Sequence, residues 1–535
     1  MMTRGQMTGG QIVTQTLREL GADTIFSVSG NQILPIYDAA ADFGLRLIHM
    51  RHESAAACAA AASAELCGRP GVLLVSAGPG YLAALTGVAT ARSLELPLLF
   101  LSGACATTDA GAGGFQDLDQ RGVSRAICKA AMEVSSVEQI HTTLVRAWQL
   151  AQAGVPGPVH VSLPADVLVA GSREATRGES RPPAAGDVPA DESVLKAMAQ
   201  RLRQAQRPLL IARPSAGRGA AGKALRVLAR QLGIQPVITE CPRGTNDLKY
   251  REVIRHYRDS DCALVVAPAD FAVGFLAESV IASAGSVLHI DAPGDPRPRR
   301  VVDLHTRVPA EIALSYLVEA TADHRPHLAE WSHLWSFSPA RETPAESSST
   351  SGGLHPLEVA KYVRELLEPE DIVVLDGGEF CQWIRLGLGD LPNRMLWNSK
   401  LGGIGGSIPM ALGIAATGHP GRTVVFLGDG TAGYHASEFE TAVRYAIPFV
   451  AIVGNDARWG AEWHMQASRY GVERTFETNL LPARYDQVAS GLGAAGFHIT
   501  DAGSLRAALS ASLSANRPAC LNVQILSVRS PAVPV

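Results

Sequence analysis

The 535-residue chain lacks the features that most readily identify membrane, secreted and nucleic-acid-binding proteins. Its most apolar stretch, 96–104, is interrupted by Pro97 and Gly103 and is far too short to span a bilayer. Residues 1–11 are polar and Gly-rich, unlike a signal peptide. The formal net charge is only −4, which provides no broad basic surface. We therefore expect a cytoplasmic protein that binds neither membranes nor nucleic acid.

Paired cysteines are also missing. The eight cysteines are scattered and none forms a C-x-x-C pair, which argues against a zinc site. A chain of this length can build large hydrophobic cores, so it has little need of a disulfide framework. We interpret the cysteines as reduced and mostly buried thiols.

What the sequence does contain is a repeated alternation of short apolar runs and helical patterns. Hydrophobic residues make up 47% of the chain and charged residues 18%, as in a globular protein. Strands alternating with helices predict parallel sheets covered on both faces. We therefore predict an α/β protein with three doubly wound parallel-sheet domains at 8–170, 192–335 and 356–530. The polar segments 171–191 and 336–355 are predicted to be linkers.

The most informative segment lies in the third block. A buried strand type at 423–427 stops at Gly428, Asp429, Gly430 and Thr431, and a helical pattern follows. The next strand, at 449–453, ends close to Asp456. Ligands bind at the carboxyl ends of strands in open parallel sheets. Two neighbouring strand ends that carry oxygen ligands suit a hard cation such as Mg²⁺, although either position alone is also typical of a turn.

The segment 428–460 resembles the thiamine diphosphate fingerprint of enzymes such as acetolactate synthase, benzaldehyde lyase and oxalyl-CoA decarboxylase. The resemblance implies that Asp429 and Asp456 ligate Mg²⁺ by their side chains and Arg458 by its main-chain oxygen. It also implies that Gly428, Gly430 and Thr431 bind the cofactor. Relatives usually have Asn where Asp456 stands, so this chain adds a negative charge beside the diphosphate.

The first block carries the other half of the resemblance. The runs 29–38 and 49–53, together with 76–80 and 115–117, match the pyrimidine-binding domain of the acetolactate synthase group in order and spacing. Taken alone, Glu53 would be interpreted as a charge at a helix N-terminus. The resemblance implies instead that Glu53 hydrogen-bonds N1′ of the cofactor's aminopyrimidine, which activates the thiazolium C2 for attack on a carbonyl.

The same resemblance assigns roles to further residues. Ile404 would be the apolar wedge under the cofactor rings, and Gly402 would offer its carbonyl to N4′. Gly378 and Glu379 would belong to the loop that covers the diphosphate. The remaining candidates face the pyrimidine or the substrate in relatives, although a surface or loop-capping role stays open for the amides: Ser76, Gln116, Asn31 and Gln32.

The resemblance implies a thiamine diphosphate- and Mg²⁺-dependent lyase or carboligase, similar to acetolactate synthase. Such an enzyme acts on a 2-oxo acid or 2-hydroxy ketone through a C2-carbanion (enamine) intermediate. One alternative is a 2-hydroxyacyl-CoA lyase or a relative of oxalyl-CoA decarboxylase, and another is a catalytically silent regulatory homologue. The central block shows no clear flavin signature, so no ligand is predicted there. Active sites between subunits are implied, in a homodimer or homotetramer.

Overall fold

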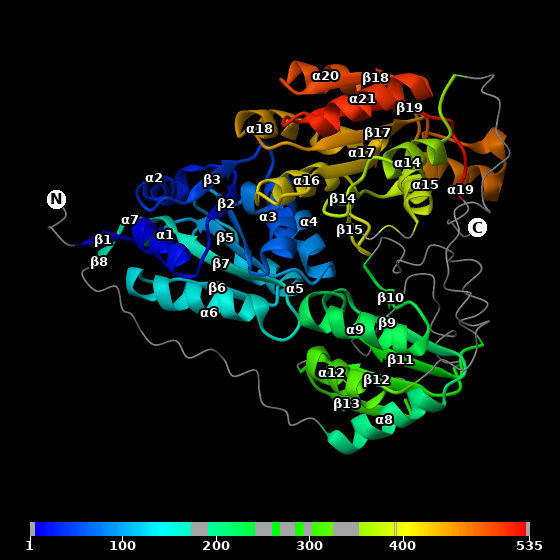
Figure 1. Ribbon diagram of the computed structural model, residues 1–535. Coiled ribbons are helices and arrows are strands. Elements are labelled where there is room, and N and C mark those ends of the chain that lie inside the picture. The colour runs from blue at the N-terminus through cyan, green and yellow to red at the C-terminus, as the bar shows by residue number, and fades with distance from the viewer. Residues whose placement is uncertain are drawn as a thin grey trace.

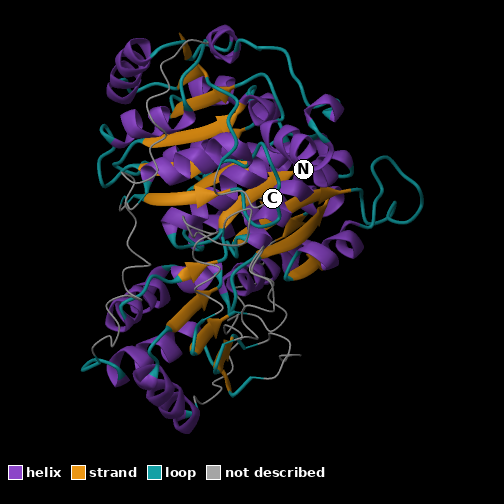
Figure 2. Ribbon diagram, turned by 90° about the vertical axis from the view of Figure 1, so that its right-hand side faces the viewer, coloured by secondary structure: helices purple, strands orange, loops and turns teal. Residues whose placement is uncertain are grey.

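The computed structural model describes residues 6–172, 191–240, 259–267, 284–293, 302–324, 352–389, 391 and 393–530. These residues form three parallel sheets, each covered by helices, which confirms the predicted fold class (Figures 1 and 2). The predicted linkers 171–191 and 336–355 lie mostly outside the described residues. The start of the first is an exception, because β8 (Gly171–Ser172) pairs antiparallel with β1 (Met7–Thr8).

The first domain is built on a six-stranded parallel sheet with the order β3-β2-β4-β5-β7-β6. The apolar runs at 24–28, 45–49, 72–76, 98–102 and 159–163 predict five of its strands, whereas no such run marks β6. The strands are β2 (Thr24–Ser27), β3 (Arg46–His49), β4 (Gly71–Val75), β5 (Leu98–Ala104), β6 (Ala130–Glu133) and β7 (Pro158–Pro164). The helices are α1 (Gly9–Glu19), α2 (Leu34–Asp42), α3 (Glu53–Cys67), α4 (Pro79–Ser93), α5 (Gln120–Ile127), α6 (Ile140–Gln152) and α7 (Ala165–Val169).

The central domain has a five-stranded parallel sheet with the order β10-β9-β11-β12-β13. Its strands are β9 (Pro208–Ala212), β10 (Val237–Ile238), β11 (Cys262–Val266), β12 (Val287–Asp291) and β13 (Leu304–Arg307). The helices that the structure describes here are α8 (Glu192–Gln204), α9 (Gly219–Leu232) and α12 (Ala310–Ala320). A separate hydrophobic core, distinct from those of the other domains, lies between these elements.

The third domain repeats the topology of the first, with the order β15-β14-β16-β17-β19-β18. Its strands are β14 (Ile372–Leu375), β15 (Arg394–Trp397), β16 (Thr423–Gly428), β17 (Val450–Asn455), β18 (Ala495–Ile499) and β19 (Ala519–Gln524). Its helices are α14 (Pro356–Arg364), α15 (Gly378–Leu388), α16 (Ser407–Ala415), α17 (Asp429–His435), α18 (Glu438–Arg444), α19 (Gly460–Tyr470), α20 (Tyr485–Gly491) and α21 (Ala502–Ser514). The apolar runs at 372–375, 395–397, 423–427, 449–453 and 520–525 predict all these strands except β18.

The first and third domains share a core in which α3 packs against α16 (Figure 1). Small side chains make this approach possible. A Cβ at Gly413 of α16 would lie 2.1 Å from the carbonyl oxygen of Ala59 in α3. The Ala-rich sequence of α3 therefore brings the two helix backbones close together, and this close contact fixes how the two domains sit.

Two further features of the described residues bear on the expectations from the sequence. Every cysteine among them is a free thiol, five of the seven are buried, and Cys241 lies outside the described ranges. No helix in the described part of the chain combines the length and the apolar character that crossing a membrane requires.

Candidate functional site

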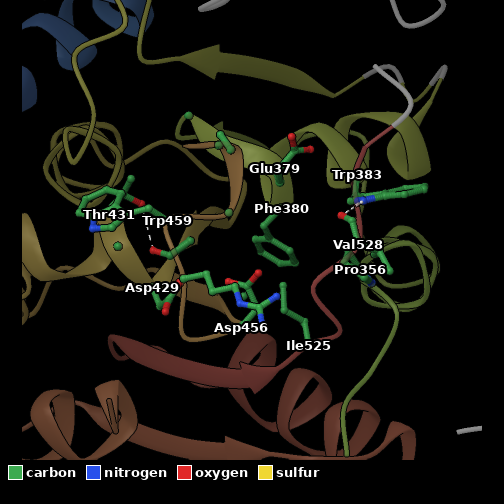
Figure 3. A pocket seen from close by; sticks show the side chains of 18 of the residues that line it. Pro356, Glu379, Phe380, Trp383, Asp429, Thr431, Asp456, Trp459, Ile525 and Val528 are labelled. Atoms are coloured by element: carbon green, nitrogen blue, oxygen red, sulfur yellow. Dashed lines mark hydrogen bonds between the residues drawn. The ribbon is translucent and has the colours of Figure 1, made fainter. Parts of the chain in front are cut away.

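The carboxyl ends of β16 and β17 lie side by side, as the sequence predicted. Gly428 pairs with Gly454 in the parallel register, so the residues that follow each strand emerge at the same edge of the sheet. Asp429 begins α17, and Asp456 follows the last residue of β17. Figure 3 shows both carboxylates at one side of a cavity.

Asp429, which is buried, and Asp456, which is partly buried, form a pair of like charges. Asp429 is 2% exposed, and its Oδ2 has no hydrogen-bond partner among the described residues. Burial, and next the charge of Asp456, raise the pKa of Asp429 to about 7, although backbone N–H groups of Gly430 and Arg458 oppose the shift. Burial also raises the pKa of Asp456. Such a pair needs either a shared proton or a cation between the carboxylates.

The side chain of Asn455, next to Asp456, makes the hydrogen bonds that hold this turn. Its side chain accepts from the backbone N–H of Ala457 and donates to the carbonyl oxygen of Ala483 and to Asn522. The φ of Ala457 is +54°, a conformation that side chains rarely adopt. Because Asn455 holds the turn, the carboxylate of Asp456 does not have to.

Arg458 follows this turn, and its guanidinium lies over the ring of Trp463, 4.3 Å from the centroid. Its positive charge and its backbone N–H both oppose the rise in the pKa of Asp456. Next to it, the N–H of Trp459 donates to the carbonyl oxygen of Thr478 at 2.8 Å. A Cβ at Gly430 would lie 2.7 Å from the ring of Trp459, so only glycine allows α17 to approach this ring.

The far wall of the cavity comes from the C-terminal segment, which the sequence did not predict. The N–H of Ser530 donates to Glu379 Oε2 at 2.8 Å, and Trp383 Nε1 donates to the carbonyl oxygen of Val528 at 3.0 Å (Figure 3). Residues about 150 positions apart form these contacts, so no local pattern could have revealed them.

A fully buried carboxylate, Asp376, holds the loop that contains Gly402 and Ile404. Asp376 accepts from the backbone N–H groups of Gly377, Gly405 and Ser407 and from the hydroxyl of Ser407. A Cβ at Gly377 would lie 3.1 Å from Ile404 Cγ2, so Ile404 sits beside the end of β14. No local pattern in the sequence identifies this clamping role of Asp376.

In the first domain, four of the predicted residues gather at the N-terminus of α4. A Cβ at Gly80 would lie 3.3 Å from Glu53 Oε1 and 3.5 Å from the Cβ of Ser76. Ser76 Oγ donates to Gln32 Oε1, and Gln32 Nε2 donates to Gln116 Oε1. Asn31, in contrast, is exposed on the short 3-10 helix Asn31–Ile33.

The loop before Glu53 is held by the third domain of the same chain. The backbone N–H of Arg51 donates to Glu438 Oε1 at 3.0 Å, and the ring of His52 meets that of His435 edge-on at 5.4 Å. Burial is the largest factor that raises the pKa of Glu438 to about 7. Sequence reasoning missed this support, which spans almost 390 residues.

Within one chain, Glu53 and the Gly402–Ile404 loop contact opposite ends of helix α4. Glu53 lies against Gly80 in the first turn of α4. A Cβ at Gly403 would lie 3.3 Å from Thr90 Oγ1, near the last turn of α4. Ten residues of α-helix correspond to about 15 Å. Glu53 and the loop of the same chain are therefore well separated along this helix.

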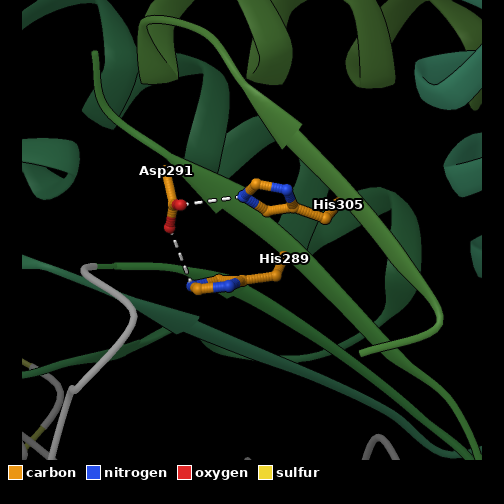
Figure 4. Close-up of side chains that lie close together, drawn as sticks. All are labelled: His289, Asp291 and His305. Carbon is orange, nitrogen blue, oxygen red and sulfur yellow. Dashed lines mark hydrogen bonds and ion pairs between the residues drawn. The ribbon is translucent and has the colours of Figure 1, made fainter. Parts of the chain in front are cut away.

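A second cluster of potential metal ligands, His289, Asp291 and His305, lies on the neighbouring strands β12 and β13 (Figure 4). His289 Nε2 lies 2.9 Å from the carbonyl oxygen of Ala267, so that nitrogen carries a proton and offers no lone pair. Asp291 is fully buried, with His305 Nε2 at 2.8 Å and Arg307 Nη2 at 3.4 Å. These side chains form an ion-pair network in which the Arg307 guanidinium already supplies the positive charge that a metal ion would bring to Asp291.

Comparison with known proteins gives the family. The model described as "Thiamine pyrophosphate enzyme, N-terminal TPP binding domain" matches residues 7–123, and the corresponding C-terminal TPP binding domain matches 376–523. A probable acetolactate synthase of Mycobacterium bovis is 30% identical over 530 residues, covering 97% of this chain and 95% of that protein. A 2-hydroxyacyl-CoA lyase 2 of Caenorhabditis elegans is 28% identical over 97% of this chain and 89% of its own length. An acetolactate synthase of Bacillus subtilis is 27% identical over 97% of this chain and 93% of its own length.

These matches confirm the resemblance found in the sequence and the prediction of an enzyme. They cover the two domains that carry the site, and the long relatives extend through the central domain as well. The chain therefore belongs to the thiamine pyrophosphate enzyme family and is a thiamine-pyrophosphate-dependent enzyme of the lyase or transferase type.

Proposed function

We propose that this enzyme uses thiamine diphosphate and Mg²⁺ to break or form a carbon–carbon bond next to the carbonyl of a small substrate, either a 2-oxo acid or a 2-hydroxy ketone. The observation that carries this proposal is the carboxylate pair of Asp429 and Asp456, at adjacent strand ends of the domain matched to TPP binding. The relatives named acetolactate synthase favour this activity.

The residues present fit a hard divalent cation. Mg²⁺ takes carboxylate oxygens together with phosphate oxygens and water. Asp429 offers a buried oxygen without a hydrogen-bond partner in the described structure, Asp456 offers a second carboxylate, and the main-chain oxygen of Arg458 would be a third ligand. A cation there would also remove the repulsion between the two buried carboxylates.

The cofactor, when bound, supplies the electron sink for the reaction. The chain's own residues then bind and orient. Gly402 would accept a hydrogen bond at its carbonyl oxygen, and Ile404, held beside β14 through the Asp376 clamp, would support the rings. Glu53 would share a proton with the pyrimidine N1′. Gly378, whose φ is +91°, lets the main chain approach the diphosphate closely.

We further propose that each active site takes Glu53 from one copy of the chain and Asp429 from another. About 15 Å of α4 separates Glu53 from the loop that would hold the pyrimidine in the same chain. Both domains also expose large apolar side chains that a second copy would cover. They are Leu82 and Phe115 in the first domain and Tyr434, Tyr470 and Phe476 in the third. A homodimer is then the smallest active unit.

A second candidate function is the cleavage of a 2-hydroxyacyl-CoA. The observation in its favour is the relatives named 2-hydroxyacyl-CoA lyase 2, which match nearly the whole chain. Turnover that requires a CoA thioester would identify this activity. A catalytically silent homologue is less well supported, because Glu53, Asp429 and Ile404 are all present.

The proposed function is tested by cofactor binding followed by a substrate panel. We expect thiamine diphosphate to bind tightly only with Mg²⁺ present, as measured by titration calorimetry. Pyruvate, benzoylformate, benzoin, acetoin and a 2-hydroxyacyl-CoA ester are then assayed for aldehyde and CO₂. Cofactor binding that is indifferent to Mg²⁺, or that survives unchanged in Asp429→Asn, would contradict the assignment.

A further inference from the structure

Three side chains in the first domain form a continuous hydrogen-bond chain. Ser76 Oγ donates to Gln32 Oε1 at 2.6 Å, and Gln32 Nε2 donates to Gln116 Oε1, also at 2.6 Å. These residues lie 44 and 84 positions apart in the sequence. Ser76 and Gln32 are 9% and 6% exposed, so water does not compete for their contacts.

Glycines pack tightly around the first two members of this chain. A Cβ at Gly30 would lie 2.1 Å from Ser76 Oγ, and one at Gly103 would lie 2.7 Å from the Cβ of Gln32. The backbone at Gly30 and Gly103 therefore confines the side chains of Ser76 and Gln32. Side chains confined in this way have little freedom to swing, and their hydrogen bonds keep one geometry.

The third member, Gln116, is held in an unusual backbone conformation. Its φ is +60°, in the left-handed region that costs a non-glycine residue on the order of 1–3 kcal/mol. Asp117 restrains the loop by accepting from the backbone N–H of Gly113 at 3.0 Å and from Cys105 Sγ. A Cβ at Gly78 would lie 3.0 Å from the Cβ of Gln116, which brings Gln116 to the same helix N-terminus as Glu53.

The direction of these hydrogen bonds decides whether Gln116 presents its amide oxygen or its amino group to the substrate. A serine hydroxyl that donates to the oxygen of Gln32 turns the amino group of Gln32 toward Gln116. The oxygen of Gln116 is then occupied, and its amino group has no hydrogen-bond partner among the described residues. Gln116 is half-buried, so this donor is neither fully hydrated nor paired within the chain.

We propose that Ser76 and Gln32 are positioning residues that turn the amino group of Gln116 toward the carbonyl oxygen of the substrate. This inference rests on the proposed function. That oxygen gains negative charge as the carbonyl carbon is attacked, and a preoriented N–H donor stabilises it there. The site consequently requires a substrate with an acceptor oxygen at the reacting carbon, such as a small 2-oxo acid.

A substitution that lets residue 32 only accept hydrogen bonds tests the direction of the Ser76–Gln32–Gln116 hydrogen bonds. In Gln32→Glu the shape is kept, but residue 32 can only accept, so Gln116 must rotate its amino group toward it and present oxygen to the substrate. Gln32→Met removes the polar contact and leaves Gln116 free to rotate. The exposed Gln204→Glu on α8 is the matched control for added charge.

The readout is the affinity of the holoenzyme for methyl acetylphosphonate, a 2-oxo acid analogue that has a reactive carbonyl but cannot release CO₂, measured by calorimetry with thiamine diphosphate and Mg²⁺ present. Losing a hydrogen bond to a charged group weakens binding by on the order of 10- to 100-fold. We expect that loss in Gln32→Glu, a smaller loss in Gln32→Met and none in Gln204→Glu. A purely structural role would not weaken binding more in the isosteric Glu variant than in Met.

Two outcomes would overturn the inference. Wild-type affinity in Gln32→Glu would mean that Gln116 already donates to Gln32 and presents its oxygen. An absence of analogue binding in the wild-type holoenzyme would mean that no such donor serves a 2-oxo acid. The exchange of the C2 hydrogen of bound thiamine diphosphate for deuterium, which depends on Glu53, is measured alongside. Exchange that the enzyme does not accelerate would instead contradict the proposed function.

Discussion

The first and third domains have the same sheet topology and put different chemistry at equivalent strand ends. In each, the second strand lies at one edge, followed by the first, third, fourth, sixth and fifth. After the third strand comes Ser76 in the first domain and Asp429 in the third. After the fourth come the loop that carries Gln116 and, in the third domain, Asp456.

The two domains therefore use the same sheet topology to bind different kinds of chemical group. The third domain gathers buried carboxylates, which suit a cation and, through it, a diphosphate. The first domain gathers a hydroxyl and two amides, which suit uncharged polar atoms, with Glu53 as the one carboxylate at its centre. A shared fold therefore fixes where groups converge, and the residues at the strand ends fix what they bind.

The largest expected effect comes from Glu53 in the first domain. Glu53→Gln keeps the shape but cannot share a proton with the pyrimidine. General acid–base catalysis contributes on the order of 10²- to 10⁴-fold, so we expect a loss of that size in the rate of C2 hydrogen exchange. Quenched-flow NMR of the bound cofactor measures it. Glu133→Gln at the exposed end of β6 is the control, and wild-type exchange in Glu53→Gln would refute the role.

A smaller effect is expected when the third domain loses a carboxylate. Asp429→Asn should weaken Mg²⁺-dependent binding of thiamine diphosphate by on the order of 10- to 100-fold, because one charged ligand is replaced by a neutral one. Calorimetry with and without Mg²⁺ measures this change. An unchanged affinity would remove Asp429 from the metal site.

The pH dependence of the cation effect sharpens the same point. The pKa of Asp429 is raised from 3.8 to about 7, so the stability linked to its proton is complete below about pH 4 and is lost as the pH rises through 7. Mg²⁺ requires the deprotonated carboxylate and competes with that proton. The rise in Tm caused by Mg²⁺ should therefore be larger at pH 8 than at pH 6. An equal rise at both pH values would contradict this.

The glycines of the third-domain turn give a packing test. In Gly430→Ala the new Cβ would lie 2.7 Å from the Trp459 ring, so the ring must move, and overpacking costs about 1–3 kcal/mol. Gly428→Ala is the matched control, because its φ is −78° and its Cβ would meet no described atom within 4 Å. Thermal unfolding of the two variants should separate them. Equal Tm values would show that the Trp459 ring is not held in place.

The smallest effect is expected at Asp456. Asp456→Asn removes one of two buried like charges and keeps an oxygen ligand, so it should retain or tighten binding of thiamine diphosphate. The turn itself should survive, because Asn455 makes its hydrogen bonds. A large loss of cofactor affinity would show that the second negative charge is required for the metal.

Local patterns predicted the strands and the third-domain site, because adjacent parallel strands bring their ends together by rule. Asp429 and Asp456 needed only that rule and the family resemblance. β6, β13 and β18 were missed, since short, half-polar edge strands such as Ala130–Glu133 give little apolar signal. The interiors of the predicted linkers lie mostly outside the described residues.

The long-range contacts that orient side chains in the first and third domains could not be predicted. Gln32 and Gln116 meet across 84 residues, and Glu379 meets Ser530 across 151. Such pairs depend on how whole domains pack, which neither periodicity nor propensity encodes. The sequence proposed Asn31 and Gln32 equally for the substrate side, and only the structure separates the exposed amide from the buried one.

The central claim is that one active site combines Glu53 of one copy with Asp429 of another. Heterodimers that carry Glu53→Gln in one copy and Asp429→Asn in the other, purified through two different tags, test it most directly by C2 hydrogen exchange. A shared site leaves one intact pair per dimer, so at a thiamine diphosphate concentration too low to fill the Asp429→Asn site we expect about half of the wild-type activity, far above that of either parent. Heterodimers as inactive as their parents would contradict the account.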